Sequence, residues 1–177
     1  MRESLNKSSK IKALDWMKKT SILSQALPFM QRYAGKNITI KFGGSAMGED
    51  KLYSSFAKDI VLLKQVGINP LVVHGGGPKI KKMLDKLKVK SSFVDGLRVT
   101  NKETMNIVEM VLSGSINKDI VMQINKEGGN AIGLSGKDAL LARTKKFKRD
   151  RKSIKFDKNL DLGFVGMPEK INYNFLN

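Results

Sequence analysis

The N-terminal part of the chain holds one long stretch in which apolar residues recur at helical spacing. This stretch covers residues 11–35, and Gly35 marks its end. Pro28 lies inside it and predicts a kink or a second short helix, because proline lacks a backbone donor. Residues 1–10 are polar and basic. We therefore expect a disordered tail over 1–10 and a kinked N-terminal helix over 11–35.

Two strand–turn–helix units come next, each with a glycine-rich turn directly after its strand. The first unit is strand 38–42, turn 43–45 and helix 50–66, and the second is strand 70–73, turn 74–78 and helix 79–87. The second strand is a short, continuous apolar run, which is typical of a buried strand in a parallel sheet. Repeated strand–turn–helix units predict an α/β fold with a mostly parallel central sheet.

The remaining pattern is less regular, and we expect residues 36–177 to form one domain of about the usual size. A helical period runs from 101 to 112, breaks at Gly114 and continues to 125. The later segments are predicted as strands 131–135 and 140–144 around a turn at 136–138, a charged loop or hairpin over 145–158, a strand at 161–165 and a first helical turn at 172–177.

Composition narrows the class of protein. No apolar run approaches the ~18 residues that a membrane helix needs, and the basic N-terminus lacks the apolar core of a secretory signal. Cysteine is absent and there is one histidine, so we expect no disulfide and no metal site of the zinc type. These features predict a cytoplasmic protein without a membrane partner.

The net charge of +17 permits two interpretations. Such a surplus can indicate nucleic-acid binding. However, the basic residues are mostly lysines spread along the chain, and only 7% of residues are aromatic. Base readout usually relies on arginine. We therefore expect a solvated lysine-rich surface, with attraction of anionic substrates as the functional alternative and nucleic acid as an unlikely partner.

Lys41 and the two glycine turns are the first candidates for chemistry. Ligands bind at the carboxyl edge of open α/β sheets, where both turns are expected to lie. Consecutive glycines let backbone N–H groups approach an anion, and a helix N-terminus adds positive potential. Neither turn has the spacing of a Walker A loop or of a dinucleotide fingerprint. Lys41 precedes the first turn and would either face solvent or reach forward to neutralise a phosphoryl group.

Three other positions carry polar side chains of interest. Arg98, between Gly96 and Thr100, could clamp a substrate carboxylate with its planar fork or simply face solvent. His74 could be a general base, but a structural hydrogen bond is the favoured interpretation. Lys137 and Asp138 are expected to form a turn with an ion pair.

The ordered set of motifs resembles the N-acetylglutamate kinase family, a branch of the amino-acid kinases. The match runs from about Leu23 to Asn177 and rests on these segments: IKFGGSAM at 40–47, VHGGGP at 73–78, DGLRVT at 95–100, TM at 104–105 with EMVL at 109–112, INK at 116–118, GLSGKD at 133–138 and DLGFVG at 161–166. The lysine–glycine–glycine opening is shared with other amino-acid kinases. The triple glycine followed by GLRVT is narrower and indicates the acetylglutamate branch.

The resemblance implies a three-layer αβα sandwich and specific residue roles. Lys41 would be catalytic, stabilising the transferring phosphoryl group, and Gly44 would contact that group through its backbone. Gly76 and Gly77 would bind substrate through their N–H groups, and Arg98 would bind a substrate carboxylate. The implied reaction transfers the γ-phosphoryl of ATP to the side-chain carboxylate of N-acetyl-L-glutamate, in arginine biosynthesis.

In such kinases the N-terminal lobe binds N-acetylglutamate, and a C-terminal lobe binds ATP and Mg²⁺. Residues 36–177 match only the N-terminal lobe, so the ATP-binding lobe is expected to be absent from this chain and the chain to be inactive alone. A fragment or early-stopped enzyme, one piece of a split enzyme, and a non-catalytic module that binds acetylglutamate or docks on a kinase remain open alternatives.

The resemblance also bears on assembly. The N-terminal lobe supplies a subunit contact in the family, so we expect a homo-oligomer. The kinked helix resembles the N-terminal extension through which arginine-inhibited relatives interlace dimers into hexamers; a helix packed on its own lobe is the alternative. Phe29 stands where many relatives have a tyrosine, which leaves a hydroxyl contact to an arginine inhibitor in doubt.

Overall fold

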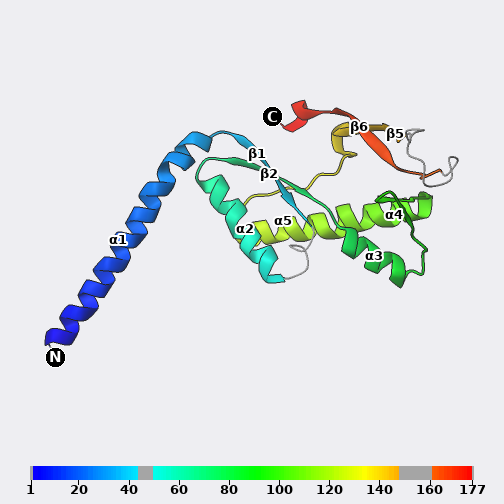
Figure 1. Ribbon diagram of the computed structural model, residues 1–177. Coiled ribbons are helices and arrows are strands. Elements are labelled where there is room, and N and C mark those ends of the chain that lie inside the picture. The colour runs from blue at the N-terminus through cyan, green and yellow to red at the C-terminus, as the bar shows by residue number, and fades with distance from the viewer. Residues whose placement is uncertain (1, 44–49, 148–160, 177) are drawn as a thin grey trace.

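The computed structural model describes residues 2–43, 50–147 and 161–176. The chain opens with one long helix, α1 (Arg2–Tyr33), which projects away from the rest of the molecule toward the N-terminus (Figure 1). The expectation of a disordered tail over 1–10 is not met for residues 2–10, since extending an existing helix needs no new nucleation step. Pro28 lies inside the helix and starts no second one.

The first two strands are paired in parallel and place both glycine turns at one edge. Strand β1 (Asn37–Phe42) pairs in register with β2 (Asn69–His74), from Asn37 opposite Asn69 to Phe42 opposite His74. Helix α2 (Asp50–Gln65) lies between them in the chain and covers one face of the pair (Figure 1). The predicted α/β fold class with a parallel central sheet is confirmed.

The hydrophobic core lies between this covered face and the helices. Phe42 stacks on Phe56 at 4.0 Å between ring centroids and meets Tyr53 edge-on at 5.1 Å. Helix α5 (Asn117–Lys126) packs against α2 and contributes Ile120 and Ile124. Other buried members of this core are Ala57, Ile60, Val61, Ile80, Leu84, Ile107, Val111 and Ile116.

The opposite face of the strand pair carries exposed side chains. Thr39 and Lys41 on β1 alternate with the core residues, and their partners across the pair are Leu71 and Val73. These two apolar residues are 42% and 49% exposed. Alternation along a strand places successive side chains on opposite faces, so Lys41 stands on the side away from the core.

A short hairpin and a continuous helical rod complete this half of the molecule. Helix α3 (Gly77–Lys86) leads to the hairpin of β3 (Phe93–Val94) and β4 (Leu97–Arg98). The rod consists of α4 (Lys102–Glu109), a π-helix (Met110–Ile116) and α5. The predicted break at Gly114 is wrong, because the π-helical turn carries the backbone through this glycine without interruption.

The C-terminal strands cover other residues than the sequence predicts. Strand β5 (Ala142–Lys146) pairs antiparallel with β6 (Gly166–Ile171), after a 3₁₀ turn at Asp138–Leu140 and before another at Tyr173–Leu176. Residues 131–135, predicted as a strand, form none. Residues 161–165 make only one bridge, between Gly163 and Thr100. Residues 148–160, which hold most of the predicted charged loop, lie outside the described residues.

Asn101 is the N-cap of α4, the first helix of the rod, and removing its side chain should lower the stability of the protein. Its side-chain oxygen accepts a hydrogen bond from the Thr104 N–H at 2.8 Å, and Thr104 itself is buried. Replacing such a cap by alanine typically lowers the free energy of unfolding by about 1 kcal/mol. Asn101→Ala should therefore shift the urea midpoint downward. Asn101→Ser should retain most of the stability, and an equal loss in both variants would contradict the capping role.

Candidate functional site

The candidate site is the edge where β1 and β2 both end. The Gly75 N–H donates to the Phe42 carbonyl at 3.3 Å, which holds the second glycine turn beside the end of β1. Gly76 is the N-cap of α3 and Pro78 occupies its first turn. The first N–H groups of a helix have no partner within that helix, so the start of α3 beside this sheet edge favours a bound anion. Lys41, exposed near the end of β1, adds positive charge to the same edge.

Gly76 lies directly against the π-helix, where a side chain would not fit. A Cβ at this position would overlap the side chains of Ile116 and Leu112. Ile116 is fully buried, so the glycine lets the turn lie directly on the π-helical segment. Gly77 is different, because a Cβ there would meet nothing within 4 Å among the described residues. Of the two predicted substrate-binding glycines, Gly76 packs inward and Gly77 is open to a ligand.

Lys79 connects the start of α3 to two other helices. Its amine donates to the Asp119 carboxylate on α5 at 3.1 Å and lies 5.4 Å from the centre of the Tyr53 ring on α2. Desolvation by burial opposes the charged amine, but the Asp119 hydrogen bond, the neighbouring Tyr53 hydroxyl and the Asp119 charge together outweigh it, so the pKa of Lys79 is raised. Sequence reasoning missed this residue, because Lys79, Asp119 and Tyr53 become neighbours only in the folded chain.

His74 and Asn117 meet behind the glycine turn. The His74 Nε2 lies 3.4 Å from the Asn117 Nδ2, and the His74 Nδ1 lies 3.2 Å from the Gly75 carbonyl oxygen. Asn117 is 9% exposed and also donates to the Leu134 carbonyl at 3.4 Å. These contacts agree with the structural hydrogen-bonding role expected for His74, and Asn117 is a partner that the sequence did not reveal.

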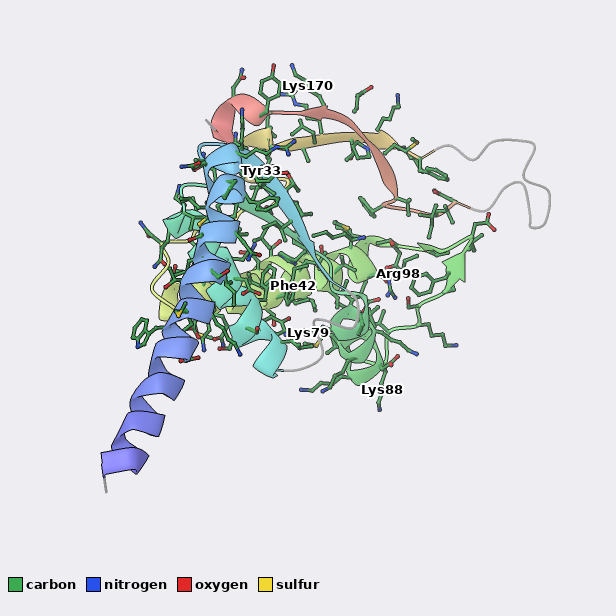
Figure 2. All side chains as sticks on the ribbon, turned by 60° about the vertical axis from the view of Figure 1, so that its left-hand side comes forward. Tyr33, Phe42, Lys79, Lys88, Arg98 and Lys170 are labelled. Carbon is green, nitrogen blue, oxygen red and sulfur yellow. The ribbon has the colours of Figure 1, made fainter. Side chains whose placement is uncertain are left out.

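Arg98 lies on β4, beyond the C-terminal part of α3. Its guanidinium donates to the Ser91 hydroxyl and lies 4.4 Å from the centre of the Phe93 ring. It borders an open hollow of about 470 Å³ whose other lining residues include Lys81, Lys88 and Lys90. Figure 2 shows Lys79, Lys88 and Arg98 in the same half of the molecule, away from Tyr33 and Lys170.

The structure therefore brings only part of the predicted set together. Lys41, Gly76 and Gly77 share the sheet edge, whereas the recorded side-chain contacts of Arg98 are with its own hairpin region. Gly44 lies outside the described residues. The expected ion pair between Lys137 and Asp138 is wrong. Lys137 instead pairs with Glu109 at 2.6 Å, and Asp138 accepts hydrogen bonds from Ser135, which lower its pKa.

In the segments 2–43, 50–147 and 161–176, no three His, Asp or Glu side chains gather closely enough to hold a metal ion. No helix in these segments is long and apolar enough to cross a membrane.

The amino acid kinase family model matches residues 36–174 of this chain. The chain is 57% identical over 164 residues to an acetylglutamate kinase of Rhodospirillum centenum, covering 92% of this chain and 54% of that protein. It is 53% identical over 165 residues to an acetylglutamate kinase of Ehrlichia canis, covering 92% of this chain and 51% of that protein. The chain thus spans about half the length of the curated relatives it matches.

A solved structure supports the fold independently. The chain superposes on an N-acetylglutamate synthase of Neisseria gonorrhoeae with a TM-score of 0.67 at 17% identity, over 89% of this chain and 34% of that one. At this identity the likeness concerns the fold alone.

Proposed function

The chain belongs to the amino acid kinase family, and on that premise we propose that it is the N-acetylglutamate-binding half of an acetylglutamate kinase. The observation that carries this proposal is the sheet edge of Lys41 and the glycine turn at the start of α3. It lies within the residues that match acetylglutamate kinases at 53–57% identity. The reaction of the complete enzyme would be phosphoryl transfer from ATP to the side-chain carboxylate of N-acetyl-L-glutamate, in arginine biosynthesis.

The proposed roles follow from charge and access. The open Gly77 and the neighbouring N–H groups would hold the acyl amino acid, and Arg98 would bind a carboxylate of it through two parallel hydrogen bonds. Lys41 and Gly44 would neutralise and contact the transferring phosphoryl group. The acceptor is an ionised carboxylate, so no general base has to remove a proton from it.

ATP and Mg²⁺ belong to this proposal only as co-substrate and ion of the complete enzyme. The described residues contain no carboxylate cluster that fits Mg²⁺. We propose that both bind mainly to a second lobe, corresponding to the part of the relatives that this chain does not match. Bound ATP would supply the phosphoryl group, and Lys41 would stabilise its charge from this side.

Assembly and location are further parts of the proposal. The described side chains of α1 leave Trp16, Ile22 and Phe29 more than 60% exposed, which supports a homo-oligomer formed partly through this helix. A dimer or a hexamer, with arginine as a feedback inhibitor of the complete enzyme, is proposed on the family resemblance. The place of action would be the cytoplasm.

Binding of N-acetyl-L-glutamate to the purified chain tests the proposal. We expect weak binding by calorimetry or NMR titration, and about tenfold weaker binding in Arg98→Ala, because a charge-assisted hydrogen bond is worth roughly 1.5–3 kcal/mol and Arg98 is partly exposed. Arg143→Ala, at an exposed arginine on β5, is the matched control and should bind like the parent. No saturable binding by the folded parent chain would overturn the proposal.

A coupled ATP-dependent phosphorylation assay separates the remaining alternatives. A substrate-binding half should be inactive alone and gain activity when the C-terminal lobe of a relative is added. That activity should then disappear in Lys41→Ala. Binding without any recovery would instead favour a non-catalytic acetylglutamate-binding or kinase-docking module. A nucleic-acid binder, by contrast, would show affinity that falls steeply with salt and is indifferent to Arg98→Ala.

A further inference from the structure

The glycine turn of the proposed site is backed by a small polar cluster made from three separate parts of the chain. His74 ends β2, Asn117 begins α5, and Leu134 belongs to the irregular segment that follows α5. His74 contacts both Asn117 and Gly75, so this cluster can act on the conformation of the turn. The hydrogen bonds among them can be assigned by donor and acceptor chemistry alone.

The orientation of the Asn117 amide is fixed by the Leu134 carbonyl. A backbone carbonyl only accepts, so the group of Asn117 that lies 3.4 Å from it has to be the NH₂. The reversed amide would place two oxygens against each other. The same NH₂ faces the His74 Nε2 at 3.4 Å. Its two hydrogens can therefore serve Leu134 and His74, one each.

The protonation pattern of His74 follows from that orientation. A nitrogen that accepts from an amide NH₂ has to carry a lone pair, so Nε2 is unprotonated. In a neutral imidazole the proton then resides on Nδ1. Nδ1 lies 3.2 Å from the Gly75 carbonyl oxygen, which is an acceptor. The chain of hydrogen bonds thus runs in one direction: Asn117 donates to His74, and His74 donates to Gly75.

Gly133 lies against the Asn117 side-chain amide, where a larger residue would not fit. A Cβ on Gly133 would overlap the Asn117 side-chain oxygen, which is buried and has no hydrogen-bond partner among the described residues. The Lys118 amine holds the same segment by donating to the Gly133 carbonyl at 3.3 Å. A buried amide oxygen left unpaired costs free energy, which the two hydrogen bonds of the NH₂ offset.

We propose that Asn117 is a positioning residue for the substrate-binding turn, which it orients by holding His74 as the neutral Nδ1–H tautomer hydrogen-bonded to Gly75. This inference rests on the proposed function for the use of the turn, but not for the tautomer. In this proposal the residue acts on the conformation of residues 75–77 through His74. Without the Asn117 amide donor, the His74 ring would no longer be held in one orientation. Its hydrogen bond to the Gly75 carbonyl would then weaken.

Nitrogen NMR of the histidine tests the proposal directly, because the chain contains a single histidine and its signals need no assignment. In ¹⁵N-histidine-labelled protein, at a pH where the ring is neutral, the parent chain should show an unprotonated Nε2 and a protonated Nδ1. Asn117→Asp places only acceptors at this point, so it should reverse the tautomer to Nε2–H. Asn117→Ala should move the ring toward the tautomer mixture of free histidine.

The control is Asn125→Asp. Asn125 is the other asparagine of α5, and its side chain also hydrogen-bonds to the irregular segment that follows this helix. Asn125 bonds to both backbone groups of Ala131, at 2.7 Å and 3.3 Å, and has no recorded contact with His74. Its variant should loosen the loop and leave the tautomer unchanged. A change of tautomer in Asn125→Asp as large as that in Asn117→Asp would overturn the specific role of Asn117.

The same samples titrated with N-acetyl-L-glutamate separate this inference from the proposed function. We expect binding several-fold weaker in Asn117→Asp than in Asn125→Asp. A parent chain with the Nδ1–H tautomer and no binding would leave the hydrogen-bond chain standing and contradict the proposed function. A parent chain with Nε2–H, or with the mixture of free imidazole, would overturn the inference even if neither variant folds.

Discussion

Gly163→Ala should lower the free energy of unfolding by about 3 kcal/mol, through backbone strain and the loss of two hydrogen bonds. Gly163 has a φ of 72°, a region that costs a residue with a Cβ roughly 1 kcal/mol or more. The new Cβ would also overlap the Thr100 carbonyl. That carbonyl accepts from the Phe164 N–H at 2.7 Å, and the Thr100 N–H donates to Leu162 at 2.9 Å. Loss of these two bonds would add about 1 kcal/mol each.

Urea unfolding followed by circular dichroism measures this loss, and Gly35→Ala provides the matched control. Gly35 has nearly the same φ, 73°, but a Cβ there would meet nothing within 4 Å. Its variant should therefore lose only the backbone component, about 1 kcal/mol. The difference between the two variants isolates the overlap with Thr100. Equal losses would show that the segment around Gly163 moves aside at no cost.

Gly76→Ala should both destabilise the chain and weaken the candidate site. Its Cβ would overlap Ile116 and Leu112, and Ile116 is fully buried in the core. Relieving such an overlap by moving packed side chains typically costs about 1–3 kcal/mol, and we expect the upper part of this range. The turn would also be pushed away from the π-helix, so binding of N-acetyl-L-glutamate should fall by more than tenfold.

The neighbouring Gly77→Ala separates packing from ligand access. No described residue lies within 4 Å of the Cβ that it would add, and alanine suits the first turn of α3 better than glycine does. Its thermal midpoint should therefore equal or exceed that of the parent. Binding should still weaken if a ligand approaches the backbone closely at this point. Unchanged binding in Gly77→Ala would place the ligand elsewhere.

The elements carrying the site were predictable because their sequence patterns act locally. The β-branched run before Gly43, the apolar run before His74 and the helical spacing after each turn fixed the parallel pair and its carboxyl edge. Each of these segments buries one recognisable face. The approach of Gly76 to the π-helix depends instead on two side chains about 40 residues away, and no local pattern reports such a contact.

The two predicted strands that did not form, 131–135 and 161–165, lost to hydrogen bonds from side chains. Residues 131–135 have the apolar alternation of a strand, but Asn125 satisfies both backbone groups of Ala131, and Asn117 and Lys118 bind the next carbonyls. With these groups satisfied, a strand partner is not needed. At 161–165 the Asp161 carboxylate binds the Gly163 N–H, which lowers the pKa of Asp161 and holds a bend where the pattern predicted a strand.

The alternation of faces along β1 makes abundance and activity separable at Lys41. Ile38, Ile40 and Phe42 point toward the core side of the pair, so a saturation mutagenesis scan of protein abundance should find them intolerant. Lys41 faces solvent and should accept most residues in such a scan. Under the proposed function, a selection for phosphorylation activity with a C-terminal lobe supplied would impose a different demand. A position that tolerates substitution in the abundance scan but not in the activity selection is constrained by chemistry and not by folding.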